Sequence, residues 1–374
     1  MQEASSMIRQ IESVPELMSF MEPELKAAVE HFLKTIDIAR FRKILLTGCG
    51  DSLCAAMAAK FVFMEYTDLE VETVSAIDLA RVYSKRQLTG NGDCLVLIVS
   101  NSGKVTRLIE LAKRVRRMGG WVAAVTGNEN SGLYQNADGV IKMNIPPFDY
   151  APGIRSYCGC LMALYLLAVA IGRQTGVLTE TENQKISSMF SNLPQQIAAY
   201  METWEMQAKG YAEKLKDSTS YEFIASGSQY ASAFFGYAKA LETTGKPASA
   251  LNTEDWFHMN FFVRDVYHTA TLLFVNRNEP SRSRALELIR TAEKMGRPLI
   301  CITDDEQLEA REKICTPALE SDLLHTLIQY LPVSMILSEA GDLLGEVYFR
   351  DGKDNWSACV NCATLINTEE YIVD

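Results

Sequence analysis

The stretch "CLVLIVSNSGKVT", residues 94–106, joins an apolar run to a polar loop. An uninterrupted apolar run of this length is typical of a strand in a parallel sheet that is covered on both faces. The loop consists of small polar residues and a glycine, and an amphipathic helical pattern follows over 105–119. The stretch therefore predicts one strand, loop and helix of an α/β fold.

The same alternation continues on both sides of this stretch. Apolar runs separated by amphipathic segments indicate a doubly wound parallel sheet. We expect further strands at 43–48, 71–75, 121–127 and 139–143, and helices that begin near Ser52 and Arg155.

The second half of the chain repeats this scheme. "LLTGCGDS" at 45–52 has a counterpart in "FIASGSQY" at 223–230, with an offset of 178 from Gly50 to Ser228. "RRMGGWVAAVTGN" has a counterpart in "EKMGRPLICITDD", with an offset of 177 from Gly119 to Gly296. Two segments with nearly the same offset predict a duplicated domain.

The predicted fold class is α/β, with two tandem doubly wound, flavodoxin-like parallel sheets. The polar helical stretch between the copies is interpreted as a connection, and both ends of the chain as additions. The expected parts are a helical arm at 1–40, a first domain at 41–175, a connection at 176–217, a second domain at 218–345 and an irregular tail at 346–374.

Composition agrees with this organisation and excludes some functions. A chain of 374 residues with 48% apolar content suits two domains. A formal net charge of −11 argues against a nucleic-acid surface. The N-terminus does not have the pattern of a signal peptide, and the longest apolar run, 161–172, is too short to span a bilayer. We expect a cytoplasmic protein that binds no membrane.

The nine cysteines suit reduced thiols, since the number is odd and Cys54, Cys94 and Cys301 stand in apolar segments. The CxxC formed by Cys359 and Cys362 has no partner pair and no nearby histidine. We interpret it as two packed thiols rather than a metal or redox site.

Two loops are expected at the carboxyl ends of neighbouring strands, where ligands bind in open parallel sheets. In "GCGDS" (48–52) and "SNSGKVT" (100–106), backbone N–H groups and the hydroxyls of Ser52, Ser100 and Ser102 would form a neutral cradle for an anion. Each serine taken alone could instead cap a helix. A dinucleotide site is disfavoured, because the third glycine of GxGxxG is missing.

At this point the sequence resembles a known family. "GCGDS", "SNSGKVT", "GSQYASAFFGYAKALE" and "NTEDWFH", in this order over roughly 40–345, are similar to the double sugar-isomerase (SIS) domain family. The family includes the isomerase half of glucosamine-6-phosphate synthase, fructosamine-6-phosphate deglycases and tagatose-6-phosphate isomerase-like proteins. The resemblance implies an enzyme without a metal or cofactor that acts on an anionic, 6-phosphorylated sugar.

The resemblance also implies substrate-binding residues around the serine loop. The family usually has Thr where this chain has Val105, so Thr106 or Arg107 would compensate, or the anion would be a sugar sulfonate. The second copy has "NRNEPSRS" at the equivalent loop, which implies one anion site per chain. The implied substrate-binding residues are Gly50, Asp51, Ser52, Ser100, Asn101, Ser102, Thr106, Arg155 and Ser156.

The family's catalytic spacing is present in the second copy. The family places a glutamate base 16 residues before a histidine, and here Glu242 and His258 are 16 apart (258 − 242), with Lys239 one turn before the glutamate. Aldose–ketose interconversion moves a proton between C1 and C2, which needs a carboxylate base and a second acid/base group. Glu254 and Asp255 match an acidic position that orients the histidine or is solvated.

Alternatives remain open for this site. His258 could be a buried structural histidine, and "HMNF" stands where the family usually has His-Gly-Pro. In the family this histidine commonly reaches the neighbouring subunit, which implies a homodimer or higher homo-oligomer with shared active sites. Arg350 and Lys353 are candidates for lining the pocket from the tail.

The reaction is either aldose–ketose isomerisation or deglycation or deamination of a ketosamine phosphate. A non-catalytic sugar-phosphate sensor is the alternative from another class, and an NAD-dependent enzyme is a distant third. Amide transfer from glutamine is not expected, because "MQEASSMIRQ" has no cysteine and the tail does not match the synthase's lysine motif.

Overall fold

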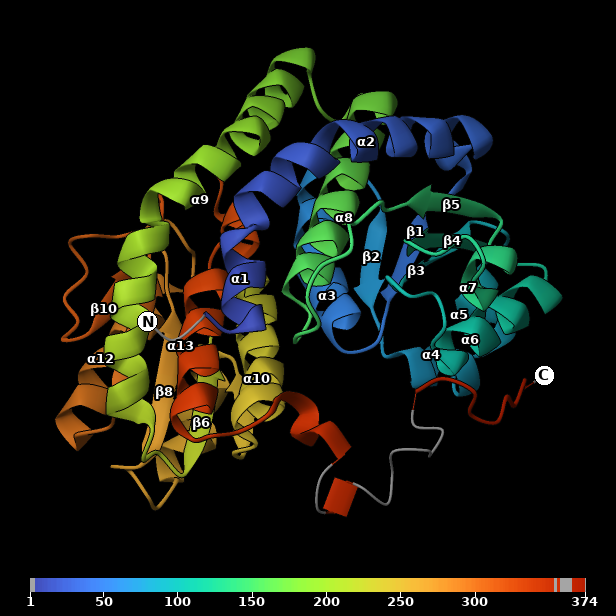
Figure 1. Ribbon diagram of the computed structural model, residues 1–374. Helices are drawn as coiled ribbons and strands as arrows, with labels where there is room; N and C mark the ends of the chain where they lie inside the picture. The colour runs from blue at the N-terminus through green and yellow to red at the C-terminus, as the bar shows by residue number, and fades with distance from the viewer. Residues whose placement is uncertain (1–3, 353–354, 357–364, 374) are drawn as a thin grey trace. The chain divides into compact units, whose positions relative to one another are not determined.

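A computed structural model describes residues 4–352, 355–356 and 365–373. The chain divides into two compact units (Figure 1). The first unit comprises Glu16–Pro147, Arg155–Asn192 and Asn361–Asp374, and the second comprises Met1–Pro15, Phe148–Ile154 and Leu193–Val360. Each unit therefore combines stretches that are far apart in the sequence.

The first unit contains a five-stranded parallel sheet. Its strand order is β2-β1-β3-β4-β5, the order of flavodoxin-like folds. Strand β3 is apolar and buried along its whole length, as expected for a central parallel strand. The strands are β1 (Lys43–Thr47), β2 (Glu70–Thr73), β3 (Cys94–Val99), β4 (Trp121–Thr126) and β5 (Gly139–Lys142).

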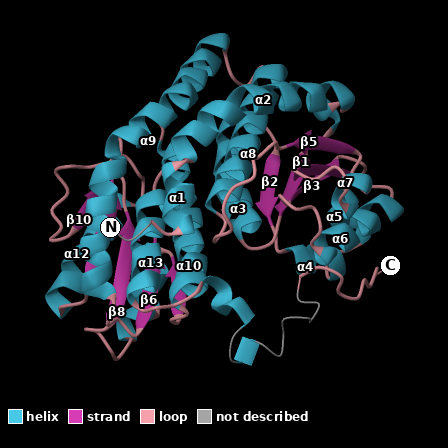
Figure 2. Ribbon diagram, in the orientation of Figure 1, coloured by secondary structure: helices cyan, strands magenta, loops and turns pink. Residues whose placement is uncertain are grey.

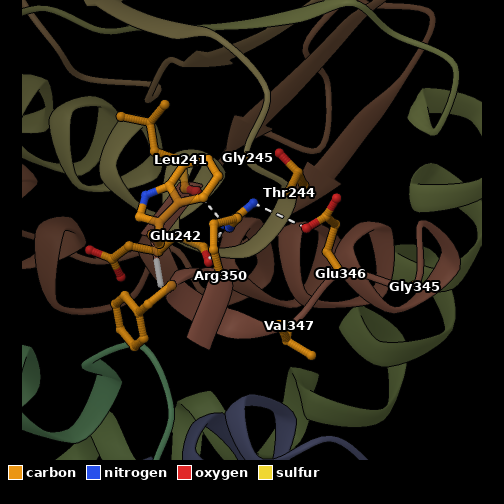
Figure 3. Close-up of a pocket in the computed structure, with 10 residues that line it drawn as sticks. Leu241, Glu242, Thr244, Gly245, Gly345, Glu346, Val347 and Arg350 are labelled. Carbon is orange, nitrogen blue, oxygen red and sulfur yellow. Dashed lines mark hydrogen bonds and ion pairs between the residues drawn. The ribbon is translucent and has the colours of Figure 1, made fainter. Parts of the chain in front are cut away.

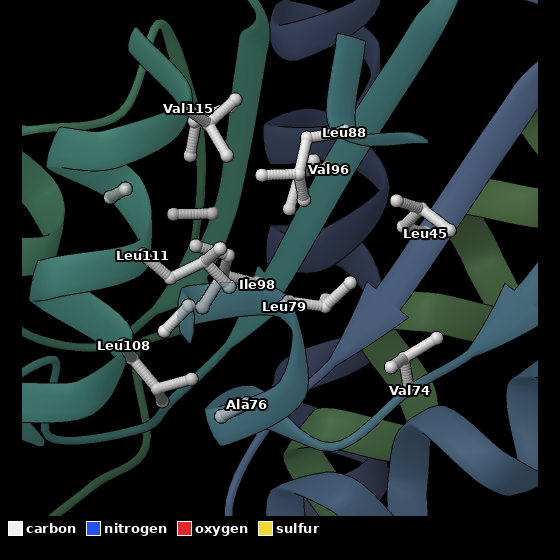
Figure 4. Packing of buried hydrophobic residues seen from close by; sticks show 14 of the residues in the cluster. Leu45, Val74, Ala76, Leu79, Leu88, Val96, Ile98, Leu108, Leu111 and Val115 are labelled. Atoms are coloured by element: carbon white, nitrogen blue, oxygen red, sulfur yellow. The ribbon is translucent and has the colours of Figure 1, made fainter. Parts of the chain in front are cut away.

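Helices cover both faces of this sheet (Figure 2). On one face, alternate strand residues such as Leu45, Val96 and Ile98 pack against Leu79 and Leu111 from the helices (Figure 4). The helices of the unit are α2 (Val14–Thr35), α3 (Asp51–Tyr66), α4 (Ala76–Arg81), α5 (Lys85–Thr89), α6 (Thr106–Arg117), α7 (Gly132–Gln135) and α8 (Ile154–Thr175), with a 3-10 turn η1 (Ile38–Arg40).

The second unit repeats the sheet. Its strand order, β10-β9-β8-β6-β7, is the first order with each strand replaced by its counterpart. The strands are β6 (Ser220–Ile224), β7 (Ala248–Leu251), β8 (Thr269–Phe274), β9 (Leu299–Thr303) and β10 (Lys313–Cys315). The predicted α/β class with two parallel sheets is confirmed.

The helices of the second unit include α1, which packs against α13. They are α1 (Ser6–Glu12), α10 (Tyr230–Thr244), α11 (Thr253–His258), α12 (Arg282–Met295) and α13 (Tyr330–Leu343), with 3-10 turns η2 (Gly227–Gln229), η3 (Asn260–Phe262), η4 (Asp322–Leu327) and η5 (Tyr348–Gly352). The long helix α9 (Glu180–Leu215) accounts for most of the expected connection and contributes residues to both units.

The structural register of the two copies differs by one residue from the one that the sequence alignment predicts at Gly50. Strands β1 and β6 begin at residues 43 and 220, an offset of 177. At this offset Gly50 (φ 55°) corresponds to Gly227 (φ 61°), and both adopt a left-handed conformation that glycine tolerates best. The equivalence of Gly50 with Ser228 is therefore wrong by one residue.

Helix α8 also differs from expectation. The apolar run predicted at 161–172 is part of a helix that is long and apolar enough to cross a membrane. However, 89% of its most apolar window is buried within the protein. Burial of this extent is typical of a core helix.

The cysteines agree with the prediction where they are described. Cys49, Cys54, Cys94, Cys158, Cys160, Cys301 and Cys315 are free thiols. Cys54, Cys94 and Cys301 are buried, as expected of small core residues. The CxxC of Cys359 and Cys362 lies outside the described residues.

A stretch near the end of the chain, residues 365–373, lies along α6 and passes beside α4 (Figure 1). We call this stretch the C-terminal segment. The buried carboxylate of Glu110 accepts a hydrogen bond from the N–H of Tyr371 at 2.9 Å, and Arg114 Nε donates to the carbonyl of Val373 at 2.9 Å. The segment has no helix or strand, in agreement with an irregular tail, but it is bound to the first unit.

Candidate active site

The loops after β1 and β3 meet at a cavity of about 240 Å³ in the first unit. We call this cavity the serine pocket. Its lining includes six of the predicted substrate-binding residues: Asp51, Ser52, Ser100, Asn101, Ser102 and Ser156. Gly50 supplies the left-handed turn that starts α3, so its role is in the backbone. The sequence therefore identified residues that lie together, although they are spread from residue 51 to residue 156 of the chain.

The serine hydroxyls shape the loop and keep a proton to donate. Ser100 Oγ accepts from the N–H of Gly103 at 3.2 Å, and Ser102 Oγ accepts from the N–H of Lys104 at 3.3 Å. The N-cap residue of α6 is Val105, so neither serine has the alternative role of capping this helix. Because a hydroxyl can accept and donate at once, both serines can still donate to a ligand.

The loop is tightly closed behind the serines. Gly103 has φ 62°, and a Cβ added there would lie 2.1 Å from Ser131 Oγ. Asn128 Nδ2 donates to the carbonyl of Ser102 at 3.2 Å. These contacts fix the loop before any ligand binds.

Among the residues that the structure describes, the lining of the serine pocket contains no lysine, arginine or histidine, whereas it does contain the carboxylate of Asp51. The nearby Arg107 ion-pairs with Glu110 and reaches the carbonyl of Glu369 at 3.5 Å. An anion in this pocket would therefore depend on hydroxyl, amide and helix-end donors, as predicted for a neutral cradle.

Two predicted residues do not line the serine pocket. The N–H of Thr106 donates to the carbonyl of Leu365 at 3.0 Å, and its hydroxyl accepts from the N–H of Thr368 at 3.2 Å. Arg155 is 7% exposed and donates to the carbonyl of Pro146 at 3.4 Å, and burial lowers the pKa of its guanidinium. Thr106 binds the C-terminal segment, and Arg155 fixes the start of α8.

Glu242 lines a larger cavity, of about 740 Å³, in the second unit (Figure 3). We call this cavity the glutamate pocket. The Glu242 side chain is 25% exposed, and its Oε2 lies 2.5 Å from Nζ of Lys239, which is fully buried. The ammonium of Lys239 also lies 4.7 Å from the centroid of the Phe235 ring. A buried ammonium at this distance favours the ionised form of the carboxylate.

The tail closes one side of the glutamate pocket. Arg350 donates to the carbonyls of Leu241 and Glu242 at 2.6 and 2.7 Å, and its other nitrogen lies 3.4 Å from Glu346 (Figure 3). Arg350 thus lines the pocket, as predicted, but its guanidinium donates hydrogen bonds to backbone carbonyls in the last turn of α10. Lys353 lies outside the described residues.

His258 is at the end of α11 and is not buried. Its side chain is 71% exposed, which contradicts the alternative of a structural core histidine. Its Nε2 lies 3.1 Å from Glu254 Oε1, and Glu254 also ion-pairs with Arg284 at 2.7 Å. Hydrogen bonds from Arg284 and then His258 lower the pKa of Glu254. His258 does not line the glutamate pocket, so the second unit does not bring it into one cavity with Glu242.

In the second copy, ion pairs and hydrogen bonds within the chain occupy the loop that is equivalent to the serine loop. Asp305 ion-pairs with Arg282 at 2.6 Å, and the N–H of Arg277 donates to Asp304 at 2.7 Å. Burial raises the pKa of Glu279 to about 7. Carboxylates of the chain itself therefore pair with this loop and the start of α12.

Sequence reasoning missed the buried pair of Glu222 and Arg297. Both side chains are almost inaccessible, and they contact the segment that carries His258. The only signal in the sequence was one glutamate inside the strand pattern "SYEFI". No cluster of three His, Cys, Asp or Glu side chains among the described residues could hold a metal ion.

Comparisons with known proteins agree with the fold. The SIS domain model matches residues 37–170. The glutamine–fructose-6-phosphate aminotransferase of Thermus thermophilus is 23% identical over 314 residues, which cover 83% of this chain and 51% of that protein. The matched region spans about a third to a half of the length of this and similar curated aminotransferases.

Two solved structures share the architecture of the chain. The C-terminal domain of glucosamine-fructose-6-phosphate aminotransferase from Francisella tularensis superposes with a TM-score of 0.82 at 16% identity, covering 93% of this chain and 98% of that one. Tagatose-6-phosphate ketose/aldose isomerase from Escherichia coli superposes with a TM-score of 0.73 at 15% identity, covering 92% and 94%. Residues 37–170 thus match the SIS domain, and the chain as a whole has the fold of these two structures.

Proposed function

We propose that this protein is an enzyme that transfers a proton between C1 and C2 of an anionic, 6-phosphorylated sugar. The observation that carries the proposal is the Lys239–Glu242 pair in the glutamate pocket, where a partly exposed carboxylate is held by a fully buried ammonium. This arrangement suits a general base, because the ion pair with Lys239 fixes the position of the carboxylate at the pocket. The relatives' printed names include a ketose/aldose isomerase and isomerizing aminotransferases, which supports the same chemistry.

In the proposed reaction, Glu242 removes the proton from C2 of an open-chain aldose, or from C1 of a ketose. The resulting enediol, or the enolamine of an amino sugar, takes the proton back at the neighbouring carbon. Lys239 keeps the carboxylate ionised and oriented. His258 assists ring opening as an acid and base, and its exposed position is compatible with a site shared between subunits of a homo-oligomer.

The serine pocket would hold the anionic end of the substrate. Ser52, Ser100, Asn101, Ser102 and Ser156 offer donors, and the Asp51 carboxylate can accept from a sugar hydroxyl. The proposal leaves out Thr106 and Arg155, because other contacts place them off the lining. We place the enzyme in the cytoplasm, without a nucleic-acid or membrane partner.

A second substrate class is favoured by one observation. Val105 lines the serine pocket where the family usually has threonine, and the lining has no cationic side chain. A monoanionic sugar sulfonate needs less compensation than a phosphate dianion. Direct comparison of a hexose 6-phosphate, a fructosamine 6-phosphate and a 6-sulfonate as substrates, with the products identified by NMR, separates these classes and also separates isomerisation from deglycation.

The decisive experiment measures deuterium wash-in at C1 and C2. Glu242→Gln should lower the exchange rate by roughly 10²- to 10⁴-fold, because it removes the general base and keeps the side chain's size. Glu346→Gln is the matched control, since Glu346 lines the same pocket and lies on its tail side. Wild-type exchange in Glu242→Gln would remove this residue from the mechanism, and sugar binding without exchange in the wild type would favour a sensor.

A mixing experiment tests the shared site. Glu242→Gln and His258→Ala proteins, each inactive alone, should regain part of the activity after subunit exchange, because some oligomers would contain one intact site. Absence of rescue after verified exchange would confine the site to one chain.

A further inference from the structure

A fully buried ion pair lies beneath the segment that carries His258. Glu222 is in the middle of β6 and Arg297 follows α12, with side chains 1% and 0% exposed and 2.7 Å between Oε1 and Nη1. Desolvation offsets most of the attraction in such a pair, so it adds little net stability. Its presence in an otherwise apolar strand therefore calls for another physical explanation.

The Glu222 carboxylate accepts four hydrogen bonds, which is about the capacity of its two oxygens. Besides Arg297, the donors are Thr271 Oγ1 at 2.5 Å, Trp256 Nε1 at 2.9 Å and Asn260 Nδ2 at 2.9 Å. Two of the four donors thus belong to the segment 253–262, which comprises α11 and η3.

Arg297 contacts the same two residues from its other side. Its Nη2 donates to the carbonyl of Asn260 at 3.1 Å, and its guanidinium carbon lies 5.3 Å from the centroid of the Trp256 ring. Trp256 and Asn260 are each two residues from His258, and each is therefore held by both members of the pair. The inner face of the segment is anchored at two points on either side of the histidine.

On the outer face of the segment, the side chains around His258 are exposed. Met259 and Phe262 are 53% and 73% exposed, and the His258 imidazole contacts Glu254, which ion-pairs with Arg284 of α12. A six-residue helix followed by a 3-10 turn has little stability of its own. The buried pair therefore supplies fixed points on the inner face of this short segment, on both sides of His258.

We propose that Glu222 and Arg297 are positioning residues that hold the backbone on both sides of His258 and leave its imidazole free to meet the substrate. The inference rests on the proposed function only in giving His258 a task. A polar anchor specifies both the register and the rotation of the segment, because each donor must meet its acceptor. An apolar contact of the same size would allow sliding.

The test removes a hydrogen bond between the buried pair and the segment 253–262, and it leaves both charged side chains of the pair in place. Asn260→Ala removes two hydrogen bonds from the His258 segment, one to Glu222 and one to Ser249 Oγ at 3.0 Å. Thr271→Val, the matched control, removes one to the same carboxylate from β8, and Ser249→Ala removes only the second bond of Asn260. Hydrogen–deuterium exchange of the peptide covering 256–263 should become at least tenfold faster in Asn260→Ala and stay at the wild-type rate in Thr271→Val and Ser249→Ala. Equal exchange in Asn260→Ala and either of the other two variants would overturn the proposal, since the link to the pair would then not be what fixes the segment.

Turnover gives the second readout. Asn260→Ala should lower kcat at least tenfold on a sugar that is mostly cyclic, change KM little, and have a smaller effect on a sugar that is mostly open-chain. Faster exchange with unchanged kcat would overturn the positioning role. If the wild-type chain turns over no sugar, the proposed function fails, whereas the exchange rates still decide whether the pair fixes the segment.

Discussion

The serine pocket allows a quantitative test of anion binding. In the variant Ser100→Ala/Ser102→Ala, each alanine removes a hydroxyl that has one proton left to donate to a ligand. A hydrogen bond to a charged group contributes about 1.5–3 kcal/mol. The lower value for two bonds gives about 3 kcal/mol, or a roughly 150-fold increase in the Kd of the sugar phosphate.

The same variant also loses two hydrogen bonds within the loop, so a control for stability is needed. Ser131 caps α7, accepts from the N–H of Tyr134 at 3.2 Å and does not line the serine pocket. Ser131→Ala should cost about 1 kcal/mol of stability and leave the Kd unchanged. Calorimetric titration with the 6-phosphate and with the sugar that lacks it gives the two affinities for each variant.

The phosphate should contribute most of the affinity in the wild type and little in the double variant. An unchanged Kd in Ser100→Ala/Ser102→Ala, at a confirmed native fold, would refute the assignment. Both serines would then have only the task of closing the loop.

Three further predictions concern other parts of the molecule. Glu279→Gln should stabilise the protein relative to wild type as pH rises from 4.5 to 8, by up to about 3 kcal/mol in urea unfolding. The native carboxyl, with a pKa of about 7 against an ordinary 4.5, resists ionisation in this pH range. Parallel curves of stability against pH for the two proteins would contradict this effect of burial. Arg350→Met should remove the hydrogen bonds that the carbonyls of Leu241 and Glu242 accept from the guanidinium and cost about 1–2 kcal/mol, with a change in the fluorescence of the exposed Trp356. Wild-type stability and emission would show that the contact is dispensable. Glu110→Gln should release the C-terminal segment, because Tyr371, Arg81 and Arg107 lose a charged acceptor. Limited proteolysis should then cut within 365–373. Resistance to the protease equal to that of wild type would show that the other contacts of the segment suffice.

The sequence predicted the strands well because their apolar runs are continuous. Strand β3 has no polar residue, and its neighbours in the sheet have the same character, so burial on both faces determined the pattern. The error in the duplication had a physical cause as well. The sequence alignment pairs Gly50 with Ser228, whereas the left-handed turns of the backbone pair it with Gly227. Only the backbone conformation shows which position needs a glycine.

The site was predictable where it depends on loops that follow strands. Ser52, Ser100 and Ser102 stand at positions that parallel topology brings together, so their meeting at one pocket required no side-chain information. The hydrogen bonds of Thr106 to the C-terminal segment could not be predicted, because its partners Leu365 and Thr368 are about 260 residues away. The Glu222–Arg297 pair could not be predicted either, because one charged residue in a strand does not indicate which distant residue is its partner.

The binding of the C-terminal segment to α6 has a consequence for biosynthesis. Residues 365–373 leave the ribosome after every other element of the first unit, whose sheet is complete by residue 142. Until then Glu110 has no N–H from Tyr371, and the start of α6 has no carbonyl from Leu365. A nascent chain would therefore hold a nearly finished first unit with an uncovered polar helix face during the whole synthesis of the second, and this face would stay accessible to chaperones and proteases until residues 365–373 are translated.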